Sequence, residues 1–236
     1  MLCMKPSKSK NARKAFTLIE LLVVVAIIFI VLAIIPTPGR GTKDRALTIQ
    51  CMSNLRQLGI VFILYAADTG KDQFPWEASK DLIDTAESDM KARASDQIAP
   101  LVGAGYFKTN LYSARFLVCP TDKTRIVCSN FSIFNDSNLS YFVSLDASIK
   151  ATTNITATIL SGDRHLSVSG QPVKPGLLMV REPLRMGWTR EMHDKTKSSP
   201  MGVIVFGDGH GEIVPDKKLP TVFQRQSIST NRLLLP

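Results

Sequence analysis

The chain has 236 residues, a length that fits one ordinary domain with an appendage and excludes a large multidomain enzyme. Hydrophobic residues make up 44% and charged residues 21%, so a wholly disordered or collagen-like chain is excluded. The net charge is +9, but five of the 29 basic residues lie in the first fifteen positions, which hold no acid. The remaining 24 basic and 20 acidic residues differ by only +4. Nucleic-acid binders concentrate Lys and Arg on one face, so no nucleic-acid partner is expected.

An apolar segment follows the basic start of the chain. Residues 16–35 hold a single charged residue, and a helix of this length spans about 30 Å, the hydrocarbon thickness of a bilayer. Because the Lys and Arg excess precedes the segment, the N-terminus is expected in the cytoplasm and the rest of the chain outside the membrane. The sequence thus predicts a transmembrane helix that crosses an inner membrane once.

Two features distinguish this segment from a secretory signal peptide. Its apolar run exceeds the usual length of about 7 to 15 residues and ends at Pro36 without a clear small-x-small cleavage site. Glu20 lies inside the run, where an acid costs up to roughly 2.5 to 3.5 kcal/mol at the bilayer centre. Either Glu20 lies shallow and reaches the headgroups, or it needs a partner within the membrane.

Residues 14–24 read KAFTLIELLVV. This run resembles the class III leader of type IV prepilins and type II secretion pseudopilins, with Ala15 where the family usually has glycine. The resemblance implies that a prepilin peptidase cleaves between Ala15 and Phe16 on the cytoplasmic side and that Phe16 is then N-methylated. Residues 1–15 would be the leader peptide and residues 16–35 the transmembrane and assembly helix.

The resemblance also implies a role for the buried acid. In pilin-like filaments the glutamate that matches Glu20 pairs with the N-terminal ammonium of a neighbouring subunit. Such a pair neutralises two charges that are costly in lipid and sets the stagger between subunits. The implied partners are the lipid bilayer, other pilin-like subunits, and an inner-membrane assembly platform driven by a cytoplasmic ATPase.

A hinge and two helices are predicted next. Residues 36–42 hold two prolines and two glycines, which break helices. Residues 43–67 predict an amphipathic helix that packs on a sheet, and residues 77–93 a weaker helix. The predicted apolar stripe of the first helix consists of Thr48, Met52, Leu55, Leu58 or Gly59, Phe62 and Ala66.

Short β-rich runs separated by turn residues follow residue 100 and predict an antiparallel sheet. The expected strands are residues 115–119, 125–128, 141–145, 157–161, 177–180 and 203–206. Residues 183–199 are polar and are expected to form a surface loop. Helices followed by strands predict the fold class α+β, with residues 43–236 as one extracytoplasmic, pilin-like domain.

Scattered runs in this domain carry a second resemblance. They are CMSNLRQLG at residues 51–59, Tyr65, Phe74 with Pro75, and FLVCPTD at residues 116–122. These runs are similar to a pseudopilin-like group abundant in Planctomycetes and Verrucomicrobia, whose members often end with a histidine, nine residues and Asp-Gly. VIVFGDGH at residues 203–210 resembles that ending, although fourteen residues separate His193 from Asp208.

Glycine-rich residues 206–212 lie between two apolar runs and predict a hairpin connection. An alternative is Ca²⁺ binding by Asp208 and Glu212, since some pseudopilins bind calcium in their C-terminal loops. Two carboxylates fall short of the usual 6 to 8 or so oxygen ligands. No cofactor or metal is therefore expected, and calcium stays a minor alternative.

Leader cleavage would remove Cys3 and leave an odd number of cysteines, Cys51, Cys119 and Cys128. An oxidising exterior permits a disulfide between Cys51 and Cys119 or between Cys119 and Cys128. Buried reduced thiols are the alternative. No pair of Cys-x-x-Cys motifs is present, so the sequence does not predict a structural zinc site.

Motifs of catalysis are absent from the sequence. Asp163 and His165 suggest an acid–base pair, but no G-x-S-x-G elbow and no nucleotide-binding glycine motif accompany them. The sequence therefore predicts a pseudopilin or prepilin-like subunit of a type II secretion pseudopilus or type IV pilus-like filament, and no enzyme. The alternatives are a single-pass anchored enzyme or binding protein that does not polymerise, and a secreted hydrolase released by ordinary signal cleavage.

Overall fold

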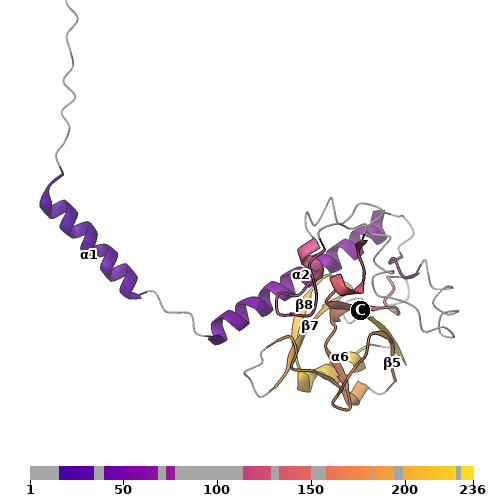
Figure 1. The fold of residues 1–236 in the computed structure, drawn as a ribbon. Helices are drawn as coiled ribbons and strands as arrows, with labels where there is room; N and C mark the ends of the chain where they lie inside the picture. The colour runs from indigo at the N-terminus through magenta and orange to yellow at the C-terminus, as the bar shows by residue number, and fades with distance from the viewer. Residues whose placement is uncertain are drawn as a thin grey trace, which may run out of the picture. The chain divides into compact units, whose positions relative to one another are not determined.

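The computed structural model describes residues 16–34, 40–68, 73–77, 114–128, 133–149, 158–181, 183–193, 199–226 and 230–236. The chain divides into two compact units, Met1–Gly39 and Arg40–Pro236 (Figure 1). The first unit holds one described helix, and the second holds all other described elements. The predicted leader and most of the predicted hinge lie outside the described residues.

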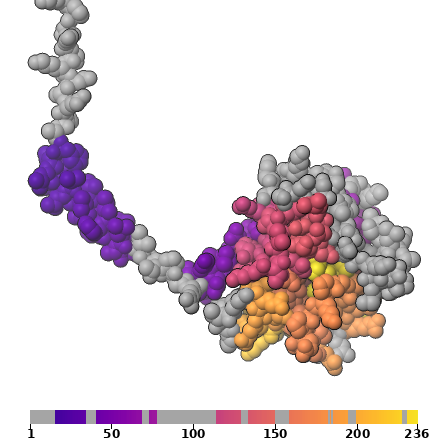
Figure 2. All heavy atoms as spheres, in the orientation of Figure 1, coloured from indigo at the N-terminus to yellow at the C-terminus, as the bar shows by residue number. Residues whose placement is uncertain are grey.

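The apolar segment forms helix α1, Leu18–Ile34 (Figure 1). Its 17 residues span about 26 Å at about 1.5 Å per residue. None of its side chains is buried. Figure 2 shows the helix in indigo with its side chains at the surface. A helix that is apolar on all sides needs lipid or other protein to cover it.

Helix α2, Arg40–Asp68, is the predicted amphipathic helix, and it begins earlier than expected. Its first three residues belong to the predicted hinge, so that boundary is wrong. Both prolines of the predicted hinge precede the helix. Of the two glycines of the hinge only Gly41 lies within the helix, and a glycine there costs only about 1 kcal/mol. Among the described helices, α2 is long and apolar enough to cross a membrane, but nearly half of its apolar window is buried in the globular unit.

α2 packs on one face of a β-sheet. Leu55, Leu58 and Phe62 are completely buried in this contact, which confirms the predicted stripe, while Met52 is half-buried. At Gly59, a Cβ atom would lie 2.8 Å from Cγ2 of Val205 in the sheet. The absence of a side chain at Gly59 therefore permits the close approach of helix and sheet.

Six antiparallel strands form this sheet, in the order β5-β9-β1-β2-β7-β8. They are β1 Tyr141–Ser144, β2 Ile159–Asp163, β5 Gly176–Val180, β7 Met201–Phe206, β8 Gly211–Pro215 and β9 Asn231–Leu235. Strands β1, β2, β5 and β7 confirm four predicted runs within two residues. The fold class is thus α+β, with an apolar N-terminal helix, a second helix and a pilin-like antiparallel sheet.

Two predicted strands are wrong, residues 115–119 and 125–128. The first is replaced by the 3-10 helix η2, Ala114–Leu117, and a turn in which the Asp122 N–H donates to the Cys119 carbonyl. The second is irregular. Its apolar Ile126 is 69% exposed, so the apolar pattern there marks no buried face. In Figure 2 this part of the chain, in magenta, lies at the surface of the globular unit.

A smaller antiparallel sheet, in the order β4-β3-β6, has no counterpart among the predicted strands. It consists of β3 Leu166–Val168, β4 Gln171–Pro172 and β6 Met186–Trp188. β6 and the 3-10 helix η6, Pro183–Arg185, lie in the predicted surface loop, which is wrong for these residues. Trp188 is the physical reason, because its buried indole N–H donates to the Val214 carbonyl at 2.9 Å.

The large sheet carries a hydrophobic core on each face. Alternate residues of a strand point to opposite faces, so Val203 and Val205 of β7 join the core under α2, while Ile204 and Phe206 join the other. Helix α6, Leu219–Gln224, which was not predicted, belongs to that second core.

The remaining expectations concern one turn and one helix. β7 and β8 pair as a hairpin, and Gly209 in its turn has φ 84°, which confirms the prediction that glycine provides the left-handed backbone there. The predicted helix over residues 77–93 lies outside the described residues, apart from Glu77.

Candidate functional sites

Thr17 and Glu20 close the N-terminus of α1 with a reciprocal capping box. Glu20 Oε2 accepts hydrogen bonds from the Thr17 backbone N–H at 2.8 Å and from its hydroxyl at 2.7 Å. The Glu20 N–H donates to Thr17 Oγ1 at 3.3 Å. Glu20 therefore has a partner within its own helix, a role that the T-x-x-E spacing signals and the sequence prediction omitted.

Cleavage before Phe16 leaves this capping box intact, because every group in it follows the bond that is cut. The Leu21 N–H donates to the Thr17 carbonyl at 3.3 Å, so the first helical hydrogen bond also survives. Phe16 is 72% exposed, and Ala15, the other predicted processing residue, lies outside the described residues.

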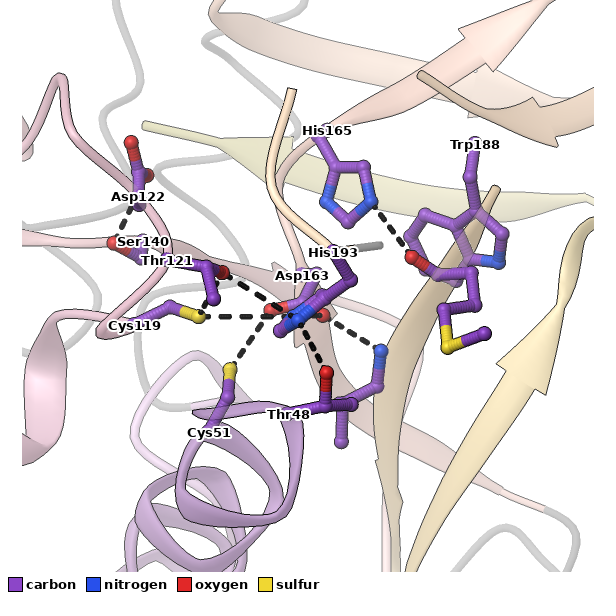
Figure 3. Close-up of polar contacts among 12 residues, drawn as sticks. Thr48, Cys51, Cys119, Thr121, Asp122, Ser140, Asp163, His165, Trp188 and His193 are labelled. Atoms are coloured by element: carbon purple, nitrogen blue, oxygen red, sulfur yellow. Dashed lines mark hydrogen bonds and ion pairs between the residues drawn. The ribbon is translucent and has the colours of Figure 1, made fainter. Parts of the chain in front are cut away.

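A second site lies inside the globular unit, where Cys51, Cys119, Asp163 and His193 converge (Figure 3). One ligand atom from each side chain lies within 4.8 Å of those of the other three, and all four residues are 0% exposed. They come from four separate segments: α2, the turn after η2, the end of β2, and the segment after β6. No prediction from the sequence joined these four residues.

The imidazole of His193 directs Nε2 into this cluster. Nε2 lies 2.9 Å from Asp163 Oδ2 and 3.6 Å from Cys119 Sγ. Asp163 Oδ2 also accepts from the Val203 N–H at 2.6 Å, and its Oδ1 accepts from the Cys51 thiol at 3.4 Å. Asp163 is thus the centre of the hydrogen-bond network.

Two threonines hold the other ring nitrogen. His193 Nδ1 lies 3.3 Å from Thr48 Oγ1 and 3.4 Å from Thr121 Oγ1. The Thr48 hydroxyl donates to the Asp44 carbonyl at 2.9 Å, so towards His193 it acts as the acceptor. This bonding assigns a proton to Nδ1 and leaves Nε2 to face the cluster.

Burial and pairing set the protonation of these groups. Burial lowers the pKa of His193, but the Asp163 carboxylate outweighs it and raises the pKa to about 10. Burial raises the pKa of Cys119, but hydrogen bonds with Cys51 and His193 outweigh it and lower the pKa to about 7. Burial raises the pKa of Cys51 well above its usual value, so Cys119 is the more acidic thiol.

An ion pair anchors the turn that carries Cys119. Arg164 Nε lies 2.8 Å from Asp122 Oδ2 and its Nη2 lies 3.1 Å from Oδ1, a bidentate contact. Burial raises the pKa of Asp122, but the hydrogen bonds from Arg164 and Thr124 outweigh it and lower the pKa to about 2. Because Arg164 follows Asp163 directly, this ion pair fixes the spacing between two segments of the cluster.

The cluster differs from a nucleophile–histidine–acid triad. In such a triad the nucleophile and the carboxylate contact opposite nitrogens of the imidazole, whereas Cys119 and Asp163 both lie against Nε2 of His193. The three residues are also fully buried. Convergence of several donors on one point is typical of ligands around an ion.

Cys51, Cys119 and Cys128 are all buried and none of the three forms a disulfide in the structure, the state given above as the alternative to a disulfide. The fold brings Cys51 and Cys119 together in the cluster and does not place Cys128 in it. A disulfide between Cys51 and Cys119 stays a prediction.

The other sequence-derived candidates have different partners. His165 Nε2 lies 3.1 Å from the Met201 carbonyl and its ring stacks on Trp188, as a packed residue near a strand end. Asp208 pairs with His210, and neither Asp208 nor Glu212 belongs to a cluster of metal-ligating groups among the described residues. Calcium binding in this hairpin stays a prediction.

Sequence reasoning missed Asp163, His193 and Thr48 as members of one site. Thr48 and Cys51 are three residues apart on α2, one turn of helix, which places them on the same face. No local pattern links that face to residues 119, 163 and 193, because their proximity arises only when the sheet and its connections pack on α2.

Comparison with known proteins supports the class that the fold and the N-terminal site define, a protein with an N-terminal apolar helix and a pilin-like domain. Residues 10–36 match the prokaryotic N-terminal methylation motif, which includes Ala15, Phe16 and Glu20. This motif supports a class III signal like that of type IV prepilins and pseudopilins, and a precursor of the pilin or pseudopilin type. No curated protein and no solved structure shows a significant match to the chain.

Proposed function

We propose that this protein is a structural subunit of a type II secretion pseudopilus or type IV pilus-like filament. It is cleaved after Ala15, N-methylated at Phe16, and assembled through the helix at residues 16–35. The observation that carries this proposal is the methylation motif at residues 10–36 on a helix with no buried side chain.

The apolar surface of α1 supports assembly through this helix. Phe29 is 68% exposed, Ile30 60% and Leu32 58%, and covering such a side chain is worth about 1.5 to 3 kcal/mol relative to water. In the precursor the bilayer covers these residues. A helix that leaves the bilayer needs neighbouring helices in place of lipid, so extraction and polymerisation are one coupled step, driven by the ATPase and its membrane platform.

The two oxygens of Glu20 allow it to cap its own helix and to pair with a neighbour. The capping box uses Oε2 only, and Oε1 takes part in no hydrogen bond among the described residues. In the filament, Oε1 accepts a hydrogen bond from the methylated ammonium group of Phe16 in an adjacent subunit. The resulting contact compensates two charges within apolar surroundings and fixes the axial stagger.

Topology follows from the same segment. The basic leader stays in the cytoplasm, where the prepilin peptidase cuts it, and the unit Arg40–Pro236 is exported to the far side of the inner membrane. There the globular units form the surface of the filament. The proposed mechanism is assembly and not catalysis.

Mass spectrometry of the mature N-terminus tests the proposal. The protein is purified from native cells with an active prepilin peptidase, and from a peptidase-deficient strain as control. The expected product starts at N-methylated Phe16 in the first strain and retains residues 1–15 in the second. A leader retained in both strains indicates a plain membrane anchor, and a start after residue 35 indicates ordinary signal cleavage; either result contradicts the proposal.

A further inference from the structure

We propose that Cys51, Cys119, Asp163 and His193 bind a Zn²⁺ ion that has a structural role in the globular unit. This inference does not depend on filament assembly, because every residue involved belongs to the unit Arg40–Pro236. The donor set consists of two sulfurs, one imidazole nitrogen and one carboxylate oxygen, which are ligand types that zinc takes in proteins.

The spacing of the donor atoms fits a tetrahedral site. With Zn–S bonds of about 2.3 Å and Zn–N and Zn–O bonds of about 2.0 Å, tetrahedral geometry separates sulfur from nitrogen or oxygen by about 3.5 Å. Cys119 Sγ lies 3.6 Å from His193 Nε2. Cys51 Sγ lies 3.4 Å from Asp163 Oδ1, whereas His193 Nε2 contacts Oδ2, so the carboxylate presents one oxygen to each of these two ligands.

The nitrogen–oxygen edge is shorter. His193 Nε2 and Asp163 Oδ2 lie 2.9 Å apart, compared with about 3.3 Å in a tetrahedral zinc site. Small side-chain rotations can lengthen this nitrogen–oxygen distance by the few tenths of an ångström required. Binding then replaces the direct contact between imidazole and carboxylate by two bonds to the ion, and the protons of Nε2 and of the thiols are released to solvent.

The surroundings of His193 prepare it as a ligand. Zinc-binding histidines usually donate their second ring N–H to an oxygen, which fixes the tautomer and the ring orientation. Thr48 and Thr121 provide this acceptor at Nδ1, and the bond from Thr48 to the Asp44 carbonyl fixes its direction. Nε2 is thereby aimed at the point where the other three donors meet.

Burial and donor chemistry favour zinc over calcium and a structural role over a catalytic one. Calcium requires about 6 to 8 oxygen ligands, and this site offers two thiols. Four protein ligands complete a tetrahedral shell and leave no position for water or substrate, as in structural zinc sites. The four residues are also 0% exposed, so an ion bound there is shielded from exchange.

A disulfide uses only part of this arrangement. A bond between Cys51 and Cys119 involves two residues and requires neither the imidazole nor the carboxylate at the same point. A single ion instead joins α2, the η2 turn, the end of β2 and the segment after β6, and it compensates two of the three negative charges of the two thiolates and Asp163. The convergence of all four side chains therefore favours the ion.

Metal analysis of the full chain tests this site. The untagged protein is purified in detergent micelles from cells grown with added zinc, and we expect about one zinc ion per chain by elemental mass spectrometry. After removal of zinc by a chelator in the presence of a reductant, Co²⁺ should give the thiolate charge-transfer and tetrahedral d–d absorption bands of a cobalt site with sulfur ligands. Added zinc should abolish these bands.

Four variants identify the ligands. Cys119→Ser and His193→Ala should lose stoichiometric zinc, whereas Cys128→Ser, a change at a buried cysteine outside the cluster, should retain it. Thr48→Val keeps the size and branching of the side chain but removes one of the two acceptors for Nδ1. Loss of such an outer contact weakens metal affinity by about 10- to 100-fold, a decrease that titration against a competing chelator measures.

Two results would overturn the zinc site. One is a Cys51–Cys119 disulfide in the freshly purified protein, seen by mass spectrometry of its peptides. The other is a zinc-free protein with reduced thiols that gives no thiolate–cobalt band. The cobalt spectrum of the unchanged protein decides the matter even where a variant fails to fold.

Discussion

At the scale of single residues, Glu20 combines two roles that need different partners. Its Oε2 caps α1 through Thr17, a contact within one turn of the helix. The proposed contact with Phe16 of a neighbouring subunit needs the charge as well as the acceptor. Substitutions that remove one feature at a time can separate the two roles.

We predict that Glu20→Gln inserts in the membrane normally but enters filaments poorly. Glutamine still accepts a hydrogen bond in the capping box, but it provides no negative charge for the ammonium. Thr17→Val is the matched control, since it removes the hydroxyl of the cap and leaves the carboxylate in place. Fractionation of membranes and sheared filaments followed by immunoblotting measures both steps, and we expect at least about a tenfold loss of filament signal for Glu20→Gln only.

Equal loss in both variants would assign Glu20 to helix capping instead of intersubunit pairing. Unchanged assembly of Glu20→Gln would refute the pairing role outright.

At the scale of elements, the contact between α2 and β7 depends on Gly59. A Cβ atom there would lie 2.8 Å from a methyl carbon of Val205, closer than ordinary side-chain contacts. Both Leu58 and Phe62 on the same face are completely buried, so the helix cannot turn away without exposing them.

We predict that Gly59→Val lowers the free energy of unfolding by about 1 to 3 kcal/mol, because it overpacks the interface between helix and sheet. Gly41→Ala is the matched control on the same helix, where a Cβ atom meets nothing within 4 Å. This change should be neutral or stabilise the protein by up to about 1 kcal/mol. Urea unfolding followed by circular dichroism measures both variants, and a Gly59→Val protein as stable as the unchanged one would contradict this packing.

At the scale of the whole molecule, the chain consists of two compact units that differ in how their apolar side chains are covered. α1 has no buried residue, while the unit Arg40–Pro236 has its own core on both faces of a sheet. The two units therefore have separate sources of stability.

We predict that a fragment of residues 40–236 stays in solution without detergent and unfolds in one cooperative transition. Its midpoint should lie within a few degrees of that of the full chain in micelles, because no described residue before Arg40 belongs to either core. Differential scanning calorimetry measures both midpoints. A molten or aggregated fragment would show that the globular unit depends on the N-terminal segment.

The predictions that held rest on local physics. Residues 14–24 specify a processing signal through residue type and order alone, and the match to the methylation motif confirms them. The spacing of Leu55, Leu58 and Phe62 predicts the buried face of α2, since helical periodicity is a property of neighbouring residues. Strand β7 was predicted because its residues face two cores in alternation, so that the whole strand is a continuous apolar run in the sequence.

The predictions that failed concern segments in which an apolar residue is exposed, or in which a mostly polar run contains a buried residue. Ile126 lies in an apolar run but is exposed, whereas Trp188 lies in a polar run but is buried. For Trp188 the contact that accompanies burial comes from a distant part of the chain, the Val214 carbonyl that accepts from its indole N–H.

By itself the sequence determined the class of the protein, its processing signal and its principal helix, because these depend on the order of residues over one or two helical turns. Only the tertiary structure brought Cys51, Cys119, Asp163 and His193 to one buried point. Residues 30 or more positions apart in the chain can meet only where strands and helices have packed, and that packing is a property of the whole core.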